Sequence, residues 1–202
     1  MTSDQVLTLV IAGLSLLVAF AGTWLSFGRA KESDRTAREA LVDARLARRE
    51  AVELALWTGA IEAVMRMIGF DPAREPVGAR LQDLRVRFTL LVDQLDSWDG
   101  FDEWLAEEHA LGVAFGREVM EQARPTDTVE ERVEKMGQYA AWAVALSSNL
   151  RFLRRRGYRP SKLRFLRDHA REVRASLYQR NSWGEMPTRV PGIEVLPDDE
   201  GV

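Results

Sequence analysis

Carboxylates that could support chemistry gather at residues 93–108. Paired carboxylates can act as general acid and base or bind a divalent cation. An EF-hand calcium loop needs its ligands in fixed positions around a glycine. With Gly100 as that glycine, Leu95 and Ala106 fall at the first and last ligand positions, so the pattern fails. We interpret this acidic corner as a solvated surface whose carboxylates favour helix N-termini. It comprises Asp93, Asp96, Asp99, Asp102, Glu103, Glu107 and Glu108.

Histidine and nucleophile patterns add no catalytic or metal site. Di-metal helical bundles use Glu-x-x-His pairs, whereas here Glu107 and Glu108 directly precede His109, and His169 has no glutamate three residues before it. The absence of cysteine excludes thiolate ligands, cysteine nucleophiles and disulfides. Serine-hydrolase elbows and Gly-rich phosphate loops are also missing. The sequence thus predicts no catalytic residue, cofactor or metal, with a membrane-tethered enzyme using residues 93–108 as an alternative.

Arginine forms the clearest positive pattern. A cationic cluster crosses the predicted helix break at Gly157 and continues along the next helix at spacings of three and four. Such a surface can bind anionic lipid headgroups, nucleic-acid phosphate or an acidic partner. Neutralisation by the chain's own acidic tail or acidic corner is the alternative. A net charge of -3 makes nucleic acid the least suitable ligand. The candidate residues are Arg151, Arg154, Arg155, Arg156, Arg159, Lys162, Arg164, Arg167, Arg171 and Arg174.

The chain begins with a long apolar segment, which precedes the elements that position these residues. From Val6 to Phe27 there is no charged residue, and about 20 apolar residues suffice to cross the hydrocarbon core of a bilayer. The Ala-Phe-Ala sequence at 19–21 resembles a signal-peptide cleavage site, but no positive charge precedes the apolar run. We therefore predict a transmembrane helix within residues 1–28, with the lipid bilayer as its partner.

The charges that flank this segment predict its orientation. Asp4 is the one charged residue before it, whereas Arg29, Lys31, Arg35 and Arg38 follow it closely. Because basic residues concentrate on the cytoplasmic side, the N-terminus should lie outside. The sequence predicts a single-pass protein of the cytoplasmic membrane, with its C-terminal domain in the cytoplasm. The preference for arginine over lysine is typical of GC-rich bacterial genomes.

Residues 29–69 are predicted to form a charged, alanine-rich stalk helix. Its small residues follow a heptad a/d pattern, typical of coiled coils, and the apolar segment carries a comparable face. Small faces let helices approach closely in lipid. We predict a homo-oligomer or a partner helix, with a solvated stripe as the alternative. We call the line of a/d residues the heptad seam. Its distal residues Ile61, Met65 and Ile68 should pack on later helices. The candidate association residues are Ala12, Ser15, Ala19 and Gly22 in the apolar segment, and Ala37, Ala40, Ala44, Ala47 and Ala51 in the stalk.

The remaining sequence predicts an antiparallel helical bundle over residues 70–180. Pro/Gly-containing breaks separate stretches of helical periodicity at 79–96, 101–123 and 161–180. A further helix opens with a capping box of Thr128 and Glu131, and its wide apolar face places it at the bundle centre. No stretch alternates as a strand would, so the fold class is all-α. Residues 181–202 are predicted to form a flexible acidic tail.

These patterns favour a non-enzymatic scaffold, assembly or regulatory subunit at the cytoplasmic membrane. In the alternative, the protein is a membrane effector whose helical domain senses an anionic ligand or nucleic acid.

Overall fold

The computed structural model describes residues 37–69, 75 and 77–187. The predicted transmembrane segment, residues 1–28, lies outside this range, as do the candidate association residues Ala12, Ser15, Ala19 and Gly22. Within the described residues, no helix combines the length and apolarity needed to cross a membrane. The chain divides into two compact units, Met1–Val52 and Glu53–Val202. A first helix covers residues 37–65 and contributes to both units.

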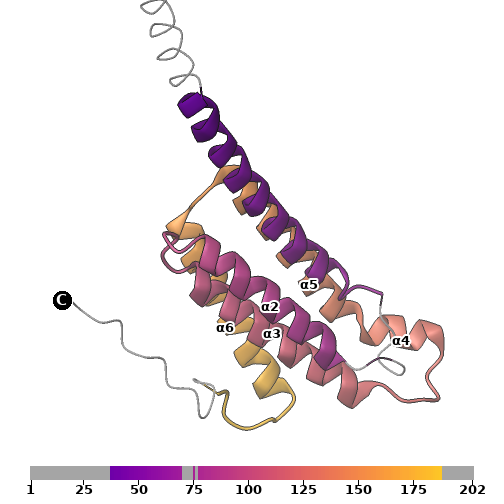
Figure 1. Ribbon diagram of the computed structural model, residues 1–202. Helices are drawn as coiled ribbons and strands as arrows, with labels where there is room; N and C mark the ends of the chain where they lie inside the picture. Colours follow the sequence, from indigo (N-terminus) through magenta and orange to yellow (C-terminus); the bar gives the residue numbers. More distant parts are fainter. Residues whose placement is uncertain (1–36, 70–74, 76, 188–202) are drawn as a thin grey trace, which may run out of the picture. The chain divides into compact units, whose positions relative to one another are not determined.

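The second unit is all-α in its described residues, which confirms the predicted fold class. Its breaks lie where the sequence placed them, and the Thr128–Glu131 capping box is present. The predicted fourth helix is divided at Met136 into two helices. After the first helix, the labelled elements are α2 (Val77–Gln94), α3 (Phe101–Gln122), α4 (Val129–Lys135), α5 (Gly137–Arg156) and α6 (Pro160–Arg180) (Figure 1).

α3 is the central helix, which corrects the prediction that the helix now seen as α5 holds this place. It contacts α2, α5 and α6. Close approach is possible because glycine faces its neighbours at two points: Gly112 lies against Trp142 of α5, and Gly116 against Val77 of α2. The apolar face of α5 is wide, but small residues on α3 decide which helix can be surrounded.

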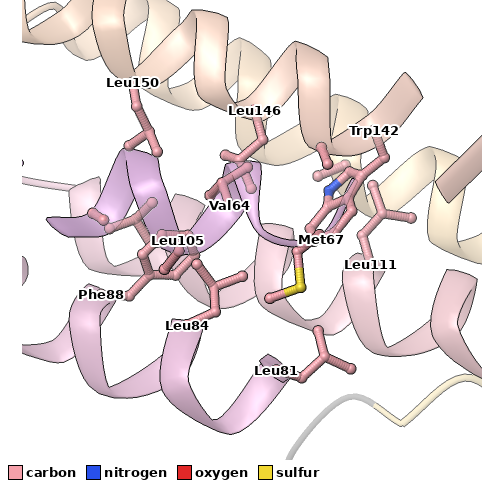
Figure 2. Close-up of a cluster of buried hydrophobic side chains, with 14 of the residues drawn as sticks. Val64, Met67, Leu81, Leu84, Phe88, Leu105, Leu111, Trp142, Leu146 and Leu150 are labelled. Atoms are coloured by element: carbon pink, nitrogen blue, oxygen red, sulfur yellow. The ribbon is translucent and has the colours of Figure 1, made fainter. Parts of the chain in front are cut away.

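The core joins the first helix to α2, α3, α5 and α6, and Figure 2 shows the part of it between the first helix, α2, α3 and α5. Val64 and Met67, both fully buried, contribute from the first helix and its C-terminal turn. Of the distal seam residues predicted to pack on later helices, Ile61 is buried and Ile68 is partly buried against the core, whereas the prediction is wrong for Met65, which is 40% exposed. A second stripe, one position earlier, carries the large Trp57. Burying that indole contributes more than burying alanine-sized side chains.

Aromatic rings gather at one end of the second unit, which we call the proximal end. Trp98, in the turn after α2, lies 5.9 Å from Trp57 and 5.7 Å from Tyr158, measured between ring centroids. The Tyr158 hydroxyl donates to the carbonyl of Asp99. These contacts place the α2–α3 turn and the α5–α6 turn beside the point where the chain arrives from residue 53. α3 and α6 therefore start at the proximal end and run parallel.

Candidate functional site

The structure divides the predicted cationic surface into a paired part and an unpaired part. Arg167 pairs with Glu103. Arg171 and Arg174 both pair with Glu107, at 2.8 and 2.7 Å. Because α3 and α6 run parallel, glutamates four residues apart on α3 meet arginines four residues apart on α6. For these arginines, neutralisation by the acidic corner, the alternative considered from the sequence, is what the structure shows.

The unpaired part surrounds the α5–α6 turn, and we call it the basic end. Its side chains are all exposed. Within residues 37–69, 75 and 77–187, none of them forms an ion pair. The Arg155 guanidinium donates to the carbonyl of Arg151 within α5. The basic end consists of Arg151, Arg154, Arg155, Arg156, Arg159, Lys162 and Arg164.

Sequence composition concentrates positive charge there, because no Asp or Glu occurs from Lys135 to Arg167. Arginines in the last turn of α5 also interact favourably with the C-terminal end of the helix dipole. Phe152 and Phe165, on either side of the turn, are 40% and 64% exposed. A surface of unpaired arginines with exposed aromatic rings suits a ligand that combines negative charge with apolar groups.

The acidic corner does not form one site. Asp93, Asp96, Asp99 and Asp102 are exposed, whereas Glu103 and Glu107 pair with α6. Glu108 corrects the interpretation of a solvated corner, because it is only 6% exposed. In the described residues, no group of three or more histidine or acidic side chains is placed to hold a metal ion.

Glu108 binds two tryptophans in the interior. Its Oε1 accepts from Trp104 Nε1 at 3.0 Å, and its Oε2 accepts from Trp142 Nε1 at 2.9 Å. Burial raises the pKa of the Glu108 carboxyl, and the two indole donors and nearby His169 oppose this only in part. Sequence reasoning missed this network: the spacing of four between Trp104 and Glu108 was visible, but the contact with Trp142 depends on how α3 and α5 pack. The network ties α3 to α5.

The two histidines differ in their surroundings. His109 is partly buried, with Nε2 3.1 Å from the carbonyl oxygen of Leu81. Burial lowers the pKa of its imidazole. His169 is exposed and stacks on Phe165 beside the basic end.

Stability should depend on pH through Glu108. A folded-state pKa above the ordinary 4.5 means that the unfolded chain releases this proton first as pH rises. The free energy of unfolding should therefore fall from about pH 4.5 upward until the folded-state pKa is passed. Glu108→Gln should lack this fall and, at acid pH, cost about 1 kcal/mol for one lost indole bond. Urea unfolding of both proteins across pH 4–8 tests this, and parallel curves would contradict it.

The stalk seam presents a second candidate surface. Ala37, Ala40, Ala44, Ala47 and Ala51 all lie on the described helix and are exposed, as is every residue from 37 to 52. Large apolar side chains are exposed on the same segment, with Leu41 at 51%, Val42 at 52% and Leu46 at 52%.

Known proteins give no guide to either surface. Comparisons with protein families, with curated proteins and with solved structures found no match.

Proposed function

We propose that this chain is a non-enzymatic, single-pass membrane protein that acts as a scaffold, assembly or regulatory subunit at the cytoplasmic membrane. The apolar segment at residues 6–27 anchors it, with the N-terminus outside and the helical domain in the cytoplasm. Residues 37–52 associate with a second copy of the chain or with a partner helix. The bundle is the cytoplasmic module that this assembly presents.

This proposal rests on the exposure of every residue from 37 to 52. Packing supplies most helical stability in proteins, so an exposed helical segment gains stability when a neighbouring helix packs on it. Alanines at heptad a and d positions provide the close-packing face that a neighbouring helix needs.

Arginine in the seam should disperse the assembly. Ala44→Arg should raise the dissociation constant of the full-length oligomer at least tenfold, or about 1.4 kcal/mol, because a guanidinium cannot be buried unpaired between helices. Val42→Arg adds the same charge on the opposite face of the heptad and should leave assembly unchanged. The mass of each detergent-solubilised protein gives the result. A monomeric wild-type protein in native-membrane crosslinking would refute self-association and leave a partner helix.

The basic end supports a second candidate function, that of an effector responding to an anionic ligand. The observation that favours it is the contrast between the arginines of α6 that pair with α3 and the seven basic-end cations that do not. A cluster of like charges without internal partners creates a positive surface potential, and such a potential attracts anions. Nucleic acid is the least suitable class, since the chain is acidic as a whole.

A further inference from the structure

The segment after α6 is held on the bundle surface. Trp183 packs edge-on against Tyr178, with ring centroids 5.3 Å apart. Its Nε1 donates to Glu121 at 2.8 Å, and the Arg117 guanidinium lies 4.3 Å from the ring centroid. These contacts with α3 and α6 fix the direction in which the chain leaves the helix.

That direction is back towards the proximal end. The carbonyl of Pro187 accepts from Arg174 Nη1 at 3.4 Å. Arg174 lies one helical turn nearer the start of α6 than Tyr178, which contacts Trp183. From Trp183 to Pro187 the chain therefore runs antiparallel to α6, and α6 begins at the basic end.

The chain beyond Pro187 is long enough to reach the basic end. From Arg174 to Lys162 is about 18 Å along α6, at 1.5 Å per helical residue. An extended chain covers roughly 3.3 Å per residue, so residues 188–198 can span about 36 Å. This reach is roughly twice the distance to be covered, so the chain can follow an indirect path.

The sequence after Pro187 complements the basic end in both charge and apolar character. The sequence after Pro187 carries acidic residues at Glu194, Asp198, Asp199 and Glu200, interleaved with Ile193, Val195 and Leu196. The basic end offers the corresponding groups: unpaired arginines and a lysine, with Phe152 and Phe165 exposed among them.

We propose that residues 193–200, the acidic tail segment, occupy the basic end of their own chain. This inference goes beyond the proposed assembly function and does not depend on whether the stalk self-associates, because every group involved belongs to the second unit.

Cysteine crosslinking tests the proposal in the full-length protein, which contains no natural cysteine. Pro197→Cys marks the acidic tail segment without removing a charge, and exposed Ser161→Cys marks the basic end. The matched control pairs Pro197→Cys with Thr126→Cys, an exposed site beyond α3 at the opposite end of the bundle. In neutral detergent, a bismaleimide should crosslink the 161/197 pair within one chain at least about fivefold more than the 126/197 pair, because docking raises the local concentration.

Charge variants separate docking from chance encounter. Arg155→Glu combined with Arg159→Glu should reduce the 161/197 yield to that of the control pair, and adding Asp198→Lys with Asp199→Lys should restore it. Molar salt, which shortens the Debye length to about 3 Å, should lower the wild-type yield. Far-ultraviolet circular dichroism checks that each variant is folded.

Two results would overturn the proposal. Equal yields for the two pairs would mean that the acidic tail segment has no preferred site. Crosslinks found only between copies, when proteins carrying Ser161→Cys and Pro197→Cys singly are mixed, would assign the contact to a neighbouring molecule. Neither result bears on Ala44→Arg, so failure here is distinguishable from failure of the proposed assembly.

Discussion

Replacing Gly112 with alanine should lower the free energy of unfolding by about 3 kcal/mol, because overpacking a filled core forces strain. A Cβ at this position would lie 2.3 Å from Cη2 and 2.6 Å from Cζ2 of Trp142. The indole has little freedom to move, since its Nε1 is hydrogen-bonded to buried Glu108. Relief therefore requires α3 and α5 to separate or the hydrogen bond to break. Urea unfolding followed by near-ultraviolet circular dichroism measures the loss.

Gly78→Ala is the matched control. Gly78 is also a helical glycine, but an added Cβ would meet nothing within 4 Å. Alanine should therefore stabilise the protein by about 0.5 kcal/mol through its higher helix propensity and the less flexible unfolded chain. Opposite signs for the two substitutions are expected. Similar effects at both sites would show that the contact between α3 and α5 is looser than described.

Helix boundaries were predictable from sequence because local chemistry sets them. The predicted third helix, 101–123, differs from α3 at one residue of its C-terminal end. Thr128 and Glu131 form the reciprocal side-chain bonds that a capping box requires. Gly157 ends α5 with a positive φ of 71°, which glycine adopts readily. Such signals act within a few residues and do not depend on the rest of the fold.

Helix faces were harder to predict because competing stripes differ by one position. Along the first helix, the heptad seam passes through Met65, whereas the buried stripe passes through Val64. The two stripes are separated by only 100° around the helix. What decides between them is the fit of Trp57 against Trp98 and Phe101, which are more than 40 residues away. No local window contains that information.

The ion pairs between α3 and α6 show the same limit. Glu103 with Glu107, and Arg167 with Arg171, were visible as acidic and basic pairs spaced four residues apart. Their mutual alignment depends on α3 and α6 running parallel, which follows from the path of α4 and α5 between them. The sequence therefore suggested that acidic residues could neutralise the arginines. It could not show which arginines would stay unpaired and form the basic end.

Glu107→Gln should lower the free energy of unfolding by about 3 kcal/mol, the scale expected when one partner of a largely buried ion pair is removed. The Glu107 and Arg174 side chains are 14% and 10% exposed. Glutamine would keep the shape but would turn an N–H donor towards guanidinium donors of Arg171 or Arg174. Urea unfolding at neutral pH gives the value. Glu103→Gln is the control: the Glu103 side chain is 56% exposed, so its loss should cost about 0.5 kcal/mol.

A double variant separates the worth of the pair from the penalty of an unpaired charge. Glu107→Leu with Arg174→Met removes both charges, and hydrophobic replacements of buried ion pairs are often neutral. The double variant should therefore recover most of the stability lost in Glu107→Gln, although Arg171 loses its partner as well. A double variant as unstable as the single one would mean that the pair itself stabilises the contact of α3 with α6. The double variant also removes the contact of the Arg174 guanidinium with the carbonyl of Pro187.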